Sequence, residues 1–172
     1  MNLNDLTIAT DQLDQPRLLK HWQWLLPAEV EVLLVTKTAD CFLLDPETGH
    51  ILFLDTTDGE LEQIAADFEQ FRNVLGDPEF ITDYFSLPLL APMLDVAMPD
   101  NTVFALPVPA VLGGSAETDE LTLVDIYEYF EQMGLLWEKL SQIDIQDEDE
   151  DEDADDETDD PPNRPLDQTK PE

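Results

Sequence analysis

The chain has 172 residues, 42% of them hydrophobic, which is enough for one folded domain of modest size. Its 41 Asp and Glu residues against 7 Lys and Arg give a formal net charge of −34 at pH 7. Charge of this sign repels DNA, RNA and anionic lipid, so we expect neither a nucleic acid nor a membrane as a ligand.

The first predicted helix covers residues 14–26. Asp14 is a suitable N-cap, Pro16 fits the first turn and Pro27 ends the helix. Apolar residues recur at helical spacing, at Leu18, Leu19, Trp22 and Leu25 or Leu26. The preceding residues have no basic and apolar segments of an export signal, and we expect a cytoplasmic protein.

Three β-rich segments follow, "EVEVLLVTKT", "DCFLLD" and "HILFLDTT". The residues "DPETGH" between the last two have turn composition, with Gly49 available for a positive φ. We therefore predict three antiparallel strands that include a tight hairpin. Cys41 is the only cysteine, which excludes an internal disulfide, and its apolar neighbours predict a buried side chain.

Two helices are predicted after the hairpin. Residues 60–75 place apolar side chains on one face, at Leu61, Ile64, Ala65, Phe68, Phe71 and Leu75. A second helix starts with Asp77 as cap and Pro78 at the first position. Its apolar residues, Phe80, Ile81, Tyr84 and Phe85, are expected to point inward. Pro88 and Pro92 then interrupt regular helix.

The last folded elements are a strand and a helix. Residues 103–106 have strand composition, but Pro107 and Pro109 confine the strand to a sheet edge or an irregular extended run. Thr122 and Asp125 resemble a capping box, which predicts a helix over 123–140. The fold class is thus α+β, a small antiparallel sheet packed against amphipathic helices.

An acidic tail is predicted over residues 144–172, which hold 15 acidic and 2 basic residues and almost no apolar side chains. Such a segment cannot bury enough surface to offset the entropy of ordering, so we expect disorder. Residues 1–143 form the single predicted domain and keep 26 acidic against 5 basic residues. That charge suits fast capture of a basic partner, with solubility alone as the alternative.

The stretch "PAVLGGSAETDEL" resembles a phosphate-binding loop only superficially. No Lys follows the glycines, and four acidic residues between 117 and 125 would repel phosphate. Ser115 is not placed as a nucleophile elbow, because it follows two adjacent glycines. A sharp turn at Gly113 and Gly114 is the favoured interpretation.

Other candidates for catalysis or metal binding are weak. His21, His50 and Cys41 lie on unrelated segments and do not make a zinc site. Carboxylate pairs such as Asp55 with Asp58 are frequent merely because the chain is acidic. We expect no enzymatic activity, no cofactor and no metal.

Four segments carry a family resemblance: "HWQWLLP", "DCFLLDPETGHILFLD", "GELEQIAADFEQF" and "VFALPVPAVLGGSAETDELTLVDIYEYF". In this order they resemble the C-terminal domain of immunity proteins that protect bacteria from DNase effectors of the type VI secretion system. A looser similarity connects the hairpin and helix to immunity folds of the SUKH type. The acidic tail is not part of that pattern.

The resemblance implies a cytoplasmic immunity protein that binds a basic toxin, a nuclease effector, and covers its substrate groove. From charge and expected exposure, the candidate contact residues are Trp24, Asp58, Glu60, Glu117, Asp119 and Glu120. Trp24 is included because Trp22 and Trp24 point in different directions on a helix, and one of them is free to anchor a partner. The alternative function is an acidic chaperone or DNA-mimic decoy that binds basic proteins mainly through its tail.

Overall fold

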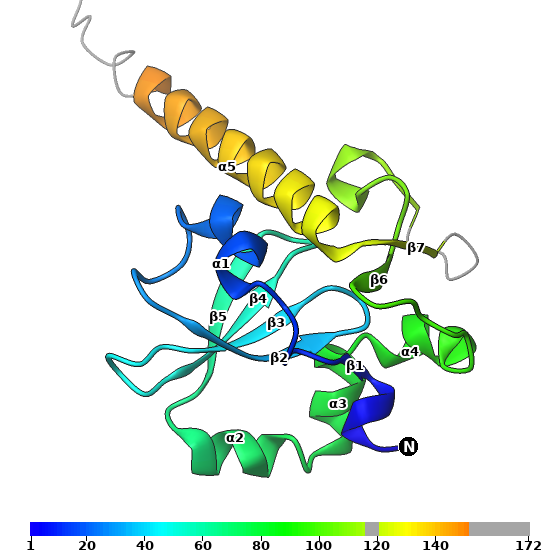
Figure 1. Cartoon of the computed structure of the whole chain (residues 1–172). Helices are drawn as coiled ribbons and strands as arrows, with labels where there is room; N and C mark the ends of the chain where they lie inside the picture. The colour runs from blue at the N-terminus through cyan, green and yellow to red at the C-terminus, as the bar shows by residue number, and fades with distance from the viewer. Residues whose placement is uncertain (116–120, 152–172) are drawn as a thin grey trace, which may run out of the picture. The chain divides into compact units, whose positions relative to one another are not determined.

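Five antiparallel strands form the central sheet of the computed structural model, in the order β1-β2-β3-β4-β5 (Figure 1). Their bounds are Thr7–Ile8, Glu31–Thr36, Cys41–Leu44, Ile51–Asp55 and Glu60–Ala65. The structure describes residues 1–115 and 121–151, with side chains up to residue 144. The chain divides into two compact units, 1–140 and 141–172. The predicted α+β class is confirmed. Residues 144–151 of the predicted tail belong instead to the last helix, α5 (Ile126–Asp151), and residues 152–172 lie outside the described residues.

The sheet is covered on both faces. On one face, Cys41, Leu43, Leu52 and Leu54 pack with side chains of α1 (Gln15–Leu18), η2 (Lys20–Trp22) and α5 (Ile126–Asp151) (Figure 1). On the other face, Phe42, Ile51 and Phe53 pack with α2 (Phe68–Val74), α3 (Pro78–Tyr84) and α4 (Leu87–Leu90). Burial on both faces explains why β3 is apolar throughout and β4 is apolar up to Leu54, since side chains alternate between faces.

The predicted helix over 60–75 is wrong in its first half. Residues 60–65 form β5, which pairs with β4, and the helix α2 begins only at Phe68. A turn at residues 55–59 reverses the chain, and Gly59 adopts a φ of 69° there. The apolar spacing fits a helix as well as this strand, and backbone pairing with β4 decides between them.

The first predicted helix is shorter than expected. Residues 15–18 form α1, and a 3₁₀ turn, η2, follows at residues 20–22. Both predicted N-caps are confirmed, because Asp14 accepts from the Arg17 N–H at 3.1 Å and Asp77 accepts from the Glu79 N–H at 2.9 Å. The 3₁₀ turn η1 (Leu3–Asp5) precedes β1, and the 3₁₀ turn η3 (Ala91–Met93) follows α4.

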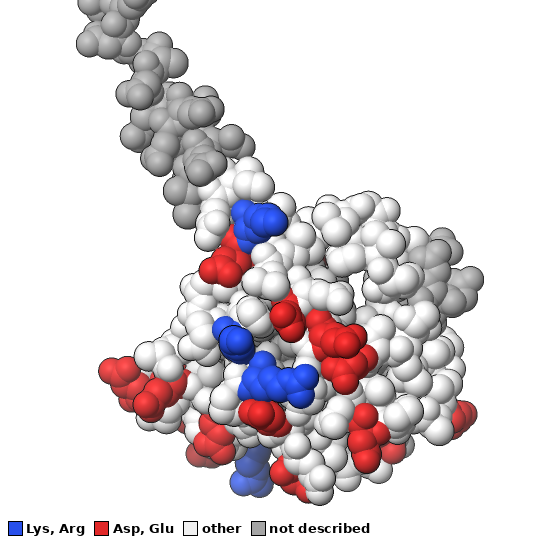
Figure 2. Space-filling model, turned by 45° about the horizontal axis from the view of Figure 1, so that its top comes forward, with Lys and Arg blue, Asp and Glu red and all other residues white. Residues whose placement is uncertain are grey.

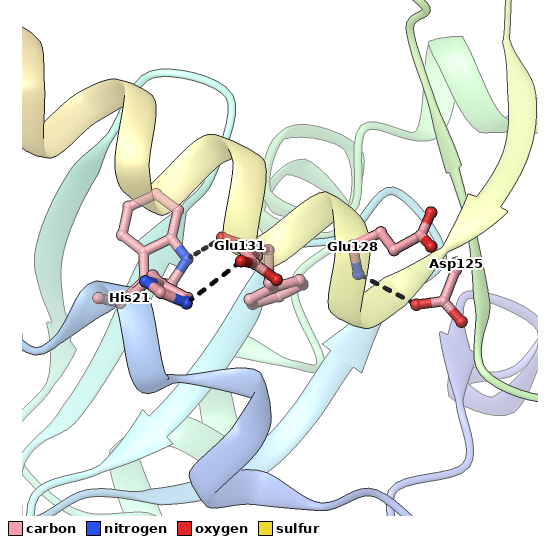
Figure 3. A network of polar contacts seen from close by, with 6 residues as sticks. His21, Asp125, Glu128 and Glu131 are labelled. Carbon is pink, nitrogen blue, oxygen red and sulfur yellow. Dashed lines mark hydrogen bonds and ion pairs between the residues drawn. The ribbon is translucent and has the colours of Figure 1, made fainter.

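The predicted strand at 103–106 is β6 (Thr102–Ala105), which pairs with β7 (Thr122–Asp125) in a separate two-stranded sheet. The predicted capping box is therefore wrong, since Thr122 begins a strand. Asp125 alone caps α5, accepting from the N–H groups of Tyr127 and Glu128 at 2.9 and 3.0 Å (Figure 3). The strand pairing of residues 122–125 leaves the helix to start at Ile126.

Between these strands, the turn η4 (Ala110–Leu112) ends at Gly113, which has a φ of 87°. A Cβ on Gly114 would overlap the Val108 carbonyl oxygen. The predicted sharp turn at the two glycines is thus confirmed, and both positions require the absence of a side chain.

Helix α5 is fixed to η2 by direct contacts. The Trp22 indole N–H donates to the Phe130 carbonyl at 3.0 Å, and His21 Nε2 lies 3.6 Å from Glu131 Oε1 (Figure 3). A Cβ on Gly134 would lie 2.6 Å from the His21 carbonyl oxygen, so the two backbones approach closely. Trp22 itself is fully buried.

Candidate binding cleft

Two adjoining hollows open at the end of the sheet where β3 begins and β4 ends. Their volumes are about 210 and 290 Å³, and Asp40, Asp55 and Ser86 line both. We call the pair of hollows the acidic cleft because six carboxylates line it: Asp40, Asp55, Asp58, Glu60, Glu62 and Asp83.

Asp40 is the most buried of these acids, with 5% of its surface exposed. Its Oδ1 accepts from the N–H of Thr56 at 3.0 Å and from the Thr56 hydroxyl at 3.3 Å. Burial, together with the negative charge of Asp55, raises the pKa of Asp40 well above its usual range. A proton is therefore retained more readily at this site than at an exposed aspartate.

Asp55 organises the turn that carries the exposed acids. Its Oδ1 accepts from the N–H groups of Thr57 and Asp58, each at 2.9 Å. Burial raises the pKa of Asp55, and the charge of Asp58 adds to the effect. Asp58 and Glu60 follow in this turn and expose their side chains to solvent.

Residues of α3, α4, β6, η4 and α5 also line the cleft, together with Ser86 and other residues between these elements. Ser86 has a left-handed backbone, with a φ of 47°, at the junction of α3 and α4. The Tyr84 hydroxyl donates to Glu62 Oε2 at 3.0 Å. Tyr129 reaches the cleft from α5, and burial raises the pKa of its hydroxyl.

The cleft is negatively charged without local compensation, since no Lys or Arg is among the described residues that line either hollow. On the face of the molecule shown in Figure 2, acidic side chains are widely spread and basic ones lie in a few small groups. Within the described part of the chain, no group of three or more His, Cys, Asp or Glu could hold a metal ion. The arrangement is thus suited to attracting cationic groups.

The structure describes three of the six candidate contact residues, and two of these three line the cleft. Asp58 and Glu60 both line the cleft, so the structure brings them together. Trp24 is half-buried against the core, and its indole N–H donates to the His21 carbonyl at 3.1 Å. It lines neither hollow of the cleft. The candidates Glu117, Asp119 and Glu120 lie outside the described residues.

Sequence reasoning missed Asp40 and undervalued Asp55. The hairpin register pairs Cys41 with Leu54, so the next residues outward, Asp40 and Asp55, are neighbours. The predicted turn at Gly49 was sufficient to count this register from the sequence. Ser86 and Tyr129 had no comparable signal, because only the tertiary packing of α4 and α5 brings them to the cleft.

No protein-family model matches this sequence, and no curated protein matches it. The resemblance to immunity proteins therefore depends on the four segments quoted above. Among the described residues, no helix is long and apolar enough to cross a membrane.

Proposed function

We propose that this chain is a cytoplasmic immunity protein that binds a basic toxin, a type VI secretion nuclease effector, and covers its substrate groove. The observation that carries the proposal is the acidic cleft, where six carboxylates meet without a lining Lys or Arg. The resemblance of the four sequence segments supports the same function.

The mechanism requires binding and no chemistry. A nuclease presents cationic side chains to the phosphates of its substrate, so an anionic surface competes directly for them. Long-range attraction accelerates the encounter, and apolar contacts around the charges then slow dissociation. On this account the carboxylates of the cleft act as charge partners and not as general acids or bases.

Survival of bacteria that produce the toxin tests the proposal. A panel of type VI secretion nuclease domains is produced, one at a time, with the full-length chain or with an empty vector. We expect the chain to restore growth and the purified chain to inhibit DNA cleavage. Continued killing, with both proteins present in soluble form, would contradict the proposal.

The acidic tail favours a second candidate function, a chaperone or DNA-mimic decoy for basic proteins, because it holds 15 acidic residues within 144–172. This function predicts binding that many basic proteins share and that salt removes. Replacing the acidic residues of 147–160 with Asn and Gln, in the full chain, separates the candidates. If the chain is a decoy, this replacement abolishes binding to basic proteins. If it is an immunity protein, binding to the toxin is retained.

A further inference from the structure

We propose that the acidic cleft is the receptor for one long cationic side chain, Arg or Lys, of the partner protein. This inference deepens the proposed function and depends on it for the identity of the partner. The cleft offers apolar side chains and carboxylates, and such a side chain has an aliphatic stem for the first and a cationic end for the second.

Apolar side chains form one wall of the first hollow. Leu89, Phe104, Leu106 and Met133 line it, and Phe104 and Met133 are buried. An aliphatic stem of three or four methylene groups can lie along such a wall while the charged end stays polar. A small anion or a hydrated metal ion has no group that uses this apolar surface.

Carboxylates stand at the polar side of the same hollow. Asp55 and Asp58 belong to one tight turn, in which Asp55 Oδ1 accepts a hydrogen bond from the Asp58 N–H at 2.9 Å. This bond constrains the spacing of the two residues. Guanidinium and ammonium groups bind carboxylates through charge-assisted hydrogen bonds. Charge complementarity therefore selects a cation for this end of the stem.

The first hollow by itself is smaller than typical sites for drug-sized ligands. Its volume is about 210 Å³, whereas sites for drug-sized ligands occupy about 300–1,000 Å³. The rim also suits a protein partner. Pro109 and Ala110 line the hollow, and the next residues of this turn, Val111 and Leu112, are 42% and 59% exposed. An apolar rim beside a charged pocket is typical of a protein interface.

Small probes test the cleft without any toxin. The full-length chain is titrated with N-acetyl-arginine methylamide. Two controls separate the parts of this side chain: the norleucine derivative has the aliphatic part without the charge, and methylguanidinium has the charge without the aliphatic part. Binding is followed through backbone amide NMR shifts. We expect the arginine derivative to bind at least about fivefold tighter than either control and to shift the amide signals of residues 55–60, 86, 104–106, 108 and 110.

A matched pair of double variants locates the binding. Asp55→Asn with Asp58→Asn removes two charges at the cleft but keeps an oxygen acceptor for the turn. Asp45→Asn with Glu47→Gln does the same in the β3–β4 turn, where Asp45 Oδ1 accepts from the Glu47 N–H at 2.9 Å. We expect the first variant to lose at least about fivefold in probe affinity and the second to retain it.

Three outcomes would overturn the inference: no shifts in the cleft, equal binding of norleucine, or equal losses in both double variants. The last would mean diffuse attraction to an acidic surface. These results are separable from the proposed function, since toxin inhibition without probe binding would reject the cleft alone. Probe binding without toxin inhibition would contradict the proposed partner but support the cleft as a site for a cationic side chain.

Discussion

Asp40, directly before β3, and Asp55, the last residue of β4, lie side by side across the hairpin, one buried and the other half-buried, and the charge of Asp55 helps to raise the pKa of Asp40. A fold that keeps two carboxylates this close at the end of a sheet loses stability when both ionise. The pair thus connects the acidity of the cleft to a measurable property of folding.

The first prediction concerns pH and Asp40. Its folded pKa lies above the unfolded value near about 3.9, so the folded state binds more protons than the unfolded state above that pH. Stability must then fall as the pH rises from about 4 through the folded pKa. Asp40→Asn removes this titration and preserves the oxygen that accepts from Thr56.

We expect Asp40→Asn to raise the melting temperature at neutral pH by about 3 °C or more and to have little effect near pH 4. Thermal unfolding between these pH values checks the prediction. Asp45→Asn is the control, because the Thr48 hydroxyl lowers the pKa of Asp45 and removing that carboxylate gives no such gain. Parallel pH profiles for wild type and Asp40→Asn would contradict the account.

The second prediction concerns Gly59 and Trp137. A Cβ on Gly59 would overlap the indole of Trp137, and the φ of 69° at Gly59 disfavours any side chain. The Trp137 indole N–H also donates to the Thr56 carbonyl at 3.2 Å, so the turn and α5 are held together. Gly59→Ala should lower the free energy of unfolding by about 2 kcal/mol or more.

Chemical denaturation measures this change, and Gly49→Ala is the matched control. Gly49 also has a positive φ, but nothing lies within 4 Å of a Cβ there. We expect the control to lose only the cost of the strained backbone, about 1 kcal/mol. Equal losses at the two glycines would mean that contact with Trp137 adds nothing.

The third prediction separates the two tryptophans. Trp22 is fully buried and its indole N–H donates to the Phe130 carbonyl, so Trp22→Phe leaves a cavity and breaks a buried hydrogen bond. We expect a loss of about 2–4 kcal/mol in the free energy of unfolding. Trp24→Phe should have a smaller effect, since Trp24 is half-buried, and a larger loss than at position 22 would reverse the assigned roles.

The fourth prediction concerns the acidic residues between Gly114 and Leu121. Replacing Glu117, Asp119 and Glu120 with Lys should slow association with the toxin and weaken inhibition, because attraction between opposite charges accelerates encounter. Stopped-flow association rates check this at low salt. The control changes Glu29 and Glu47, both exposed, to Lys. Unchanged association rates would exclude these three residues from the interface.

The sequence was most informative where local chemistry decides the structure. Asp14 and Asp77 act as predicted caps, and Gly49 adopts a φ of 79° in the predicted hairpin turn. Cys41 is fully buried as its apolar neighbours indicate. Capping and turn residues are set by interactions within a few positions, so they can be recognised in one chain.

Sequence reasoning failed where distant contacts decide. The segment 60–65 has apolar residues that fit a helix, yet pairing with β4 makes it a strand. Asp125 ends β7 and caps α5 at once, a double role that the capping pattern did not reveal. The cleft follows the same rule, since its acids come from the residue before β3, the end of β4, the β4–β5 turn, β5 and α3, and only the assembled fold places them together.

The dissociation constant of the full-length chain with its cognate nuclease domain tests the central claim most directly. Three proteins are compared by calorimetry: wild type, Asp58→Lys with Glu60→Lys, and the chain with neutral residues over 147–160. We predict at least about 30-fold weaker binding for the cleft variant and near wild-type binding for the neutral tail. The reverse order, with the tail essential and the cleft dispensable, would contradict the account.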